Sequence, residues 1–201
     1  MFGAAAILMI TMGVRQSAGL FVLPLYADLE LDYASISFAF AVGQLLWGAV
    51  QPVFGAVAER WGSRRVLVLG ALLLAAGLAT TPLVTSEAGL LLTMGVLSAA
   101  GAGAGSFSVL IGATAGHVPA ERRSFAGGFI NAGGSFGQFV VAPLAQAVMS
   151  AFGWAAALLS LAGAALVTIP LAWTLRPQPQ TPRPAHPVED SGLLRQVSAA
   201  L

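Results

Sequence analysis

Charged residues fall into a few tight groups along this 201-residue chain, and long uncharged stretches separate the groups. The uncharged stretches cover residues 33–58, 66–86, 88–120 and 124–175. About 20 apolar residues cross the hydrocarbon core of a bilayer as one helix. Each of the first three stretches is therefore long enough for one crossing, whereas the 52 residues of the last stretch are enough for two.

Six membrane-spanning helices are predicted once the apolar N-terminal segment is added to these runs. Gly153 and Trp154 divide the longest run, because glycine interrupts helices and tryptophan is enriched at membrane interfaces. The segments are continuous apolar runs, unlike the alternating ten-residue strands of a membrane β-barrel. The predicted fold is an all-α membrane protein with spans near Phe2–Tyr26, Ser35–Ala58, Val66–Val84, Leu90–Ala115, Ser124–Met149 and Trp154–Leu175.

The composition agrees with a lipid environment and excludes several other classes of protein. Hydrophobic residues make up 57% of the chain and charged residues 8%, whereas a soluble domain has roughly a quarter charged residues. Intrinsic disorder, a coiled coil and a nucleic-acid-binding domain do not fit these numbers. The chain has no cysteine, and its two histidines, His117 and His186, lie outside the spans. We therefore expect no enzyme activity, no catalytic residues, no metal site and no cofactor.

Arginine placement predicts the orientation in the membrane. Eight arginines lie in the loops 59–65 and 116–124 and in the C-terminal tail, whereas the opposite loops carry acidic residues and no arginine. Basic residues accumulate in cytoplasmic loops. We expect a multi-pass protein of the inner (plasma) membrane, with the arginine-bearing loops and both chain ends in the cytoplasm.

The chain changes character at Arg176, which divides a membrane domain (residues 1–175) from a cytoplasmic tail (residues 176–201). Five prolines in Arg176–Pro187 predict an extended linker. The last eleven residues place four apolar side chains on one side of a short amphipathic helix: Leu193, Leu194, Val197 and Leu201.

One loop between the second and third spans has a specific pattern. The loop combines glycines with charged residues at fixed spacings: Gly55, Glu59, Arg60, Gly62, Arg64 and Arg65. Gly55 is expected to let helices approach closely, and Gly62 to permit a tight reversal of the chain. The alternative is a plain turn whose charges only set the topology.

This loop resembles the signature loop of the major facilitator superfamily in sequence and in position, except that Glu59 stands where aspartate is commoner. The stretches Gly13–Gly19, Gln44–Pro52, Val118–Ser124 and Ala132–Gln138 are similar to bacterial monocarboxylate and oxalate/formate transporters. The resemblance covers residues 3–175, the first half of a normal twelve-span transporter. It implies a bundle of two inverted three-helix repeats, in which the loop is a conformational gate against the second half.

Arg15 is the one charged residue inside a predicted span, and it lies about 18 Å of helix from either surface. An arginine at the bilayer centre costs about 3 kcal/mol on insertion scales and needs a solvating partner. No acidic residue lies inside the predicted spans. A neutralising group must then come from a missing partner or from an anionic ligand, which suits the guanidinium fork. The alternative is a purely structural arginine that is bonded to backbone carbonyls.

Further polar residues inside the spans are candidates to line a substrate path or to bond helices together. Alongside Arg15, the candidate substrate-binding residues are Gln16, Gln44, Ser106, Asn131 and Gln138. The glycine pairs Gly101/Gly105 and Gly133/Gly137 have a spacing that favours close helix packing.

The sequence therefore predicts a secondary transporter half that binds a small organic anion, a mono- or dicarboxylate, and works by alternating access. Its expected partners are the lipid bilayer, the anion, and a second six-helix half supplied by the same gene, a separate chain or a homodimer; nucleic acid is not expected. The alternative is a non-transporting remnant or a membrane scaffold that requires a partner.

Overall fold

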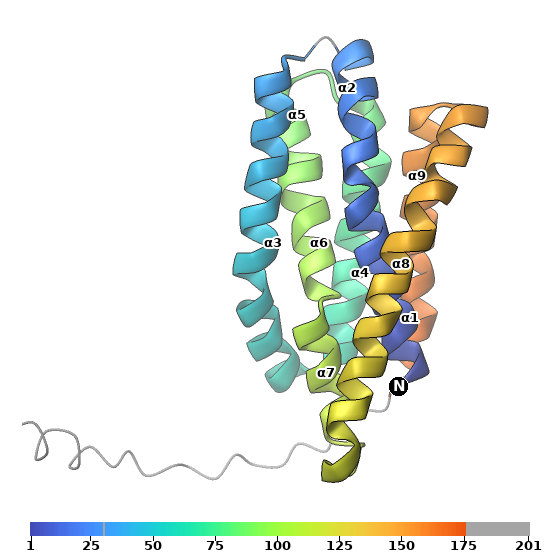
Figure 1. Ribbon diagram of the computed structural model, residues 1–201. Coiled ribbons are helices and arrows are strands. Elements are labelled where there is room, and N and C mark those ends of the chain that lie inside the picture. The colour runs from blue at the N-terminus through green and yellow to red at the C-terminus, as the bar shows by residue number, and fades with distance from the viewer. Residues whose placement is uncertain (30, 176–201) are drawn as a thin grey trace, which may run out of the picture.

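Six long helical segments run side by side in the computed structural model, which describes residues 1–29 and 31–175 (Figure 1). Each segment is long and apolar enough to cross a membrane, which confirms the predicted number of spans. Observed and predicted ends differ by a few residues, because helical backbone continues past the apolar run. The segments are Phe2–Leu29, Tyr33–Trp61, Ser63–Leu83, Glu87–Thr114, Ala120–Phe152 and Trp154–Trp173. The predicted linker and amphipathic helix at 176–201 lie outside the described residues.

Three spans are built on one uninterrupted helix each. The second span is α3 (Tyr33–Trp61), and the sixth is α9 (Trp154–Trp173). The fifth is α8 (Arg123–Phe152), preceded by the short turn η4 (Ala120–Arg122). Each of the three helices contains a proline, at Pro52, Pro143 or Pro170.

Two other spans change helix type along their length. The first consists of α1 (Phe2–Gln16), a 3₁₀ stretch η1 (Ser17–Phe21) and α2 (Val22–Leu29). The third is α4 (Ser63–Thr80), which ends in the 3₁₀ turn η2 (Thr81–Leu83).

The fourth span is the most irregular. It contains α5 (Glu87–Leu90), a π-helical stretch η3 (Leu91–Ser98), α6 (Ala99–Ala104) and α7 (Phe107–Ala115). Its helix is broken at Gly105 and Ser106. The Thr11 hydroxyl of the first span lies within hydrogen-bond distance of the Gly105 carbonyl oxygen, at 3.1 Å.

The helix contacts repeat between the two halves of the bundle. The first span packs against the fifth, and correspondingly the fourth span packs against the second. The third and sixth spans pack against each other. Contacts of the third span with the fourth are likewise matched by contacts of the sixth with the first. Exchanging spans one to three with spans four to six therefore preserves the contact pattern. Because each repeat has three crossings, the two repeats run in opposite directions, as the inverted-repeat prediction requires.

Glycines make the closest helix crossings possible. A Cβ atom on Gly137 of α8 would lie 1.9 Å from the Met9 carbonyl oxygen of α1. A Cβ atom on Gly101 of α6 would lie 2.3 Å from the Leu74 backbone nitrogen of α4. The predicted packing role of these glycine-rich segments agrees with this geometry.

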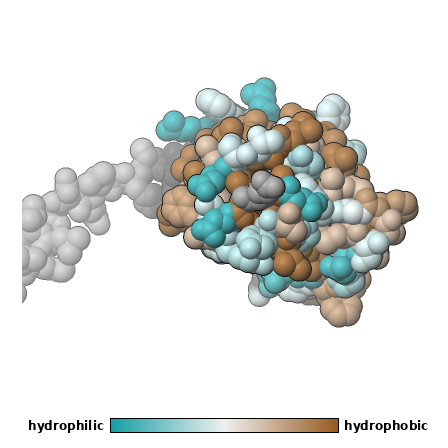
Figure 2. Space-filling model, turned by 90° about the horizontal axis from the view of Figure 1, so that it is seen from above, coloured by the Kyte–Doolittle hydropathy of each residue, from teal (hydrophilic) through white to brown (hydrophobic). Residues whose placement is uncertain are grey.

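The N-terminus lies at the same end of the bundle as the turn at Gly62 and the segment that leads into α8 (Figure 1). We call this the N-terminal end. The opposite end carries exposed polar residues, among them Asp28, Asp32 and Glu87, and hydrophilic side chains are visible on it in Figure 2. Apolar side chains such as Phe38 and Phe139 are exposed between the two ends, where lipid or another chain can cover them.

Candidate functional site

Arg15 lies in the last turn of α1, just before the backbone tightens into the 3₁₀ stretch. The Ser17 hydroxyl donates to the Gly13 carbonyl over 2.9 Å at this junction. In the span Phe2–Leu29, Arg15 is about halfway along, roughly 20 Å of helix from either end. Arg15 therefore lies near the middle of the first span.

Two side chains of α3 hold the guanidinium. Nη2 of Arg15 donates a hydrogen bond to Oε1 of Gln44. The Arg15 Cζ atom lies 3.9 Å from the centroid of the Trp47 ring, in a cation–π contact. Because Gln44 and Trp47 are three residues apart, they share one face of α3. Within the described residues, the side chains of Gln44 and Trp47 thus contact the Arg15 guanidinium from α3.

Neither of these partners carries a negative charge, so the arginine is held but not neutralised within residues 1–29 and 31–175. The guanidinium has five N–H donors, and one bond to Gln44 uses one of them. A charge removed from bulk water in this way favours a bound counter-ion. The arrangement can accept the two oxygens of a carboxylate side by side.

A cavity of about 200 Å³ opens beside the guanidinium, between the first four spans. Its polar mouth is formed by Arg15, Gln16 and Gln44, together with Trp47. Deeper walls come from α4, η3 and α6 and are mostly apolar; they include Leu74, Leu78, Met94, Ser98, Ala99 and Ala102. The π-helical stretch supplies two of these residues, in keeping with the frequent occurrence of π-bulges at functional sites.

Trp47 also carries a donor without a partner, and that donor is closed off from solvent. Its Nε1 atom is the one buried side-chain nitrogen or oxygen in the described residues that has no hydrogen-bond partner. A buried N–H without a partner costs about 1–3 kcal/mol. Trp47 is not among the site residues predicted from the sequence, although its spacing of three residues from Gln44 places both on one face of α3.

The other predicted site residues lie elsewhere. Ser106 is buried at the break of the fourth span, where its hydroxyl is 3.0 Å from that of Ser108, and Ser108 donates to Gln51 over 3.3 Å. Asn131 and Gln138 are exposed on α8 and do not line the Arg15 cavity. The structure therefore brings Arg15, Gln16 and Gln44 together and leaves the remaining three outside this cavity.

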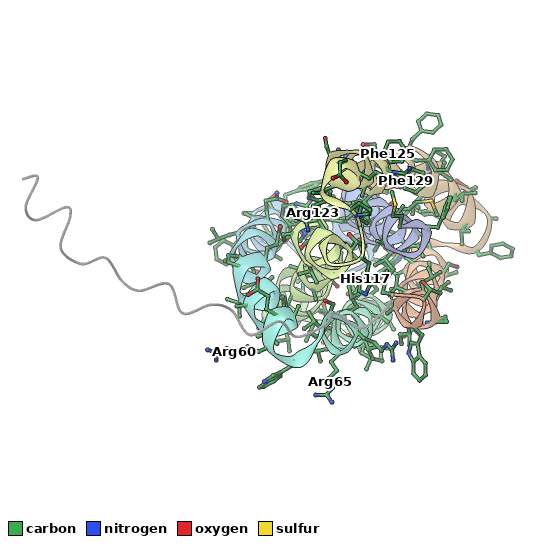
Figure 3. The ribbon with its side chains drawn as sticks, turned by 90° about the horizontal axis from the view of Figure 1, so that it is seen from below. Arg60, Arg65, His117, Arg123, Phe125 and Phe129 are labelled. Carbon is green, nitrogen blue, oxygen red and sulfur yellow. The ribbon has the colours of Figure 1, made fainter. Side chains whose placement is uncertain are left out.

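The signature loop forms the turn between α3 and α4. Glu59 and Arg60 lie in the last turn of α3, and Gly62 reverses the chain with a φ of 91°, a value that favours glycine. The Cζ atom of Arg64 lies 5.3 Å from the centroid of the Trp173 ring, in a cation–π contact. Figure 3 shows Arg60 and Arg65 at the edge of the N-terminal end, pointing away from the bundle.

The close approach that we expected at Gly55 is absent from the described residues. A Cβ atom on Gly55 would meet no atom within 4 Å. No helix of this half crosses there, so the expectation was wrong for contacts within residues 1–29 and 31–175.

These features define a multi-pass membrane protein built as a bundle of six crossings with internal inverted symmetry. The model of the Major Facilitator Superfamily matches residues 2–198 of the chain. The chain belongs to this superfamily.

Several proteins that are similar in sequence to this chain are named as monocarboxylate transporters. The chain is 30% identical over 165 residues to monocarboxylate transporter 11 of Mus musculus. This match covers 82% of the chain and 36% of the mouse protein. The chain is 29% identical over 165 residues to monocarboxylate transporter 13 of Rattus norvegicus, with 82% and 38% covered. The chain thus spans little more than a third of the length of these relatives.

A solved structure shares the fold. The inward-open conformation of the xylose transporter XylE from E. coli matches with a TM-score of 0.69 and 20% identity. The match covers 89% of the chain and 48% of the solved chain, so the six spans correspond in extent to about half of that transporter.

Proposed function

We propose that this chain is one half of a secondary transporter for small organic anions, in which Arg15 binds the negative group of the substrate. The observation that carries the proposal is the geometry of Arg15: a guanidinium near the middle of the first span, held by two neutral side chains at the mouth of a cavity. The names of the monocarboxylate transporters to which the chain is similar agree with a carboxylate as the substrate.

A complete transporter of this kind has a second six-helix half, and alternating access is a rocking of the two halves around the binding site. Two observations support the need for such a partner. The chain spans 48% of the similar solved transporter. In addition, α3 and α8 expose large apolar side chains, including Leu45 and Phe136, that another bundle can cover.

The proposed orientation places the N-terminal end of the bundle in the cytoplasm. Arg60, Arg64 and Arg65 are exposed at that end, as are Arg122 and Arg123. The excess of basic residues at one end supports this assignment. In this orientation the loop from Gly55 to Arg65 is proposed to act as a gate, because Arg60 and Arg65 are exposed and point away from the bundle, where a second half can contact them.

Uptake of labelled acetate, formate, oxalate, lactate and pyruvate by cells that express the chain together with its second six-helix half tests the proposal, alongside binding of the same anions to the purified chain. Arg15→Gln removes the charge and keeps a side chain that can bond to Gln44, so we expect uptake to fall at least tenfold. The matched control is Arg122→Gln, an exposed arginine outside the cavity, which should leave uptake unchanged.

Equal uptake by wild type and Arg15→Gln would remove Arg15 from the substrate site. A wild-type chain that neither transports nor binds any of these anions would favour the alternative function, a membrane scaffold without transport activity.

A further inference from the structure

We propose that the N-terminal end of the bundle carries a binding site for the headgroup of an anionic phospholipid, where α4 crosses α9. The site consists of the Arg64 guanidinium beside the ring of Trp173. Neither residue lines the Arg15 cavity, so this inference does not depend on the proposed transport function. The site also lies on helices other than α3 and α8, whose exposed apolar faces are proposed above to meet a second half.

The contact with Trp173 holds Arg64 without using its hydrogen-bond donors. Arg64 belongs to the first turn of α4, and Trp173 is the last residue of α9. The Cζ atom lies 5.3 Å from the ring centroid, and within the described residues this is the one contact that the Arg64 side chain makes. An indole ring offers no oxygen or nitrogen acceptor, so the five N–H donors of the guanidinium remain for another partner.

The charge around Arg64 is not balanced by the chain itself. The first turn of α4 contains Arg64 and Arg65 and no acidic residue. Among the residues that the structure describes, no carboxylate is paired with Arg64. A guanidinium binds two oxygens of a phosphate side by side. A phosphate ester with a net negative charge therefore complements this site.

Two exposed tryptophans indicate that the site lies at the level of the lipid headgroups. Trp173 is 66% exposed at the end of the sixth span, and Trp61 is 68% exposed at the end of the second, on the same end of the bundle. Tryptophan is enriched where the membrane meets water. An arginine beside an interfacial tryptophan lies where it can reach a headgroup phosphate.

Exposed residues also lead from the site along both helices, at spacings of three or four residues that keep them on one face. On α9 this face begins at Trp173 and continues through Pro170, Leu166, Gly163 and Leu159. On α4 it begins at Arg65 and continues through Leu69, Leu72 and Ala76. Because α4 and α9 pack against each other, acyl chains below a headgroup at Arg64 can lie along these two faces. Free phosphate has no chains to place there, so we assign the site to a phospholipid.

Tryptophan fluorescence in nanodiscs measures which lipid occupies the site. Every protein compared carries Trp61→Phe, so that Trp173 is the tryptophan left at the N-terminal end. The nanodiscs contain equal amounts of phosphatidylglycerol and phosphatidylcholine, and one of the two lipids carries bromine on its acyl chains, which quenches nearby tryptophans. We expect phosphatidylglycerol to occupy the site about fivefold more often, because one arginine at a membrane surface favours an anionic lipid by about this factor.

Charge variants identify the residue that is responsible. Arg64→Gln should reduce the preference to about one, since the neutral side chain no longer selects an anionic headgroup. Arg64→Lys keeps the charge and loses the paired donors, so we expect about half of the original preference. Arg122→Gln removes an exposed arginine from the same end of the bundle and is the matched control, which should keep the full preference.

Several results would overturn the assignment. Equal quenching by the two brominated lipids in the parent protein refutes the site, and an equal loss in Arg64→Gln and Arg122→Gln attributes the preference to the general charge of this end. If Arg64→Gln does not fold, a full preference in Arg64→Lys refutes the role of the guanidinium. Inorganic phosphate and sodium chloride at equal ionic strength should have the same effect, whereas loss of the preference in phosphate alone would show a site for free phosphate instead of a lipid.

Discussion

The crossing of α1 and α8 makes a prediction about stability that can be worked out from distances. At Gly137 an added Cβ atom would lie 1.9 Å from the Met9 carbonyl oxygen and 2.6 Å from its carbonyl carbon, whereas ordinary contacts begin at 3.4 Å. These atoms belong to the backbone, so no side-chain rotation can relieve the clash. The substitution Gly137→Ala must push the two helices apart.

The expected cost follows from the packing that is lost. Overpacking a close contact costs about 1–3 kcal/mol, and helix association in a membrane depends on such van der Waals contact. The alanine regains up to about 1 kcal/mol of helix propensity. We therefore expect Gly137→Ala to lower the free energy of unfolding by about 1–2 kcal/mol in mixed micelles titrated with SDS.

Gly163→Ala on α9 is the matched control for this measurement. A Cβ atom there would meet nothing within 4 Å. Only the gain in helix propensity remains, so the control should be neutral or slightly stabilising. Equal unfolding free energies for the two variants would refute the close α1–α8 crossing on which the fold description depends.

Two further predictions concern the turn at Gly62 and the orientation of the bundle. Gly62→Ala should lower the free energy of unfolding by about 1–3 kcal/mol, because its φ of 91° is strained for alanine; the same micelle titration tests this, and a neutral effect would contradict the observed turn. Because the chain has no cysteine, a membrane-impermeant thiol reagent should label Ser86→Cys on intact cells and Ser124→Cys only after permeabilisation, whereas the reverse pattern would invert the proposed orientation.

The number of spans could be predicted because it depends on composition along the chain alone. Charges are costly inside a bilayer, so their positions mark the ends of helices wherever the helices sit relative to one another. The reversal at Gly62 could be predicted for a similar reason, since a tight turn between two helices needs a residue that tolerates positive φ.

The cavity could not be predicted in the same way. Trp47 contacts Arg15 only because α3 presents that face to α1, and facing depends on the packing of all six spans. The π-helical stretch Leu91–Ser98 and the break at Gly105 are also set by tertiary contacts, such as the contact with Thr11. The expected contact at Gly55 failed because glycine in a helix signals close packing without naming the partner.

The assignment of Arg15 as the anion-binding residue is tested by equilibrium binding of labelled butanoate to the purified chain in nanodiscs, compared among wild type, Arg15→Lys and Arg15→Gln. Charge-assisted hydrogen bonds contribute about 1.5–3 kcal/mol. We expect a loss of at least tenfold in affinity for Arg15→Gln, and an intermediate affinity for Arg15→Lys, which keeps the charge and loses the paired donors. Butanoate bound equally well by all three proteins would contradict the assignment of Arg15 as the anion-binding residue.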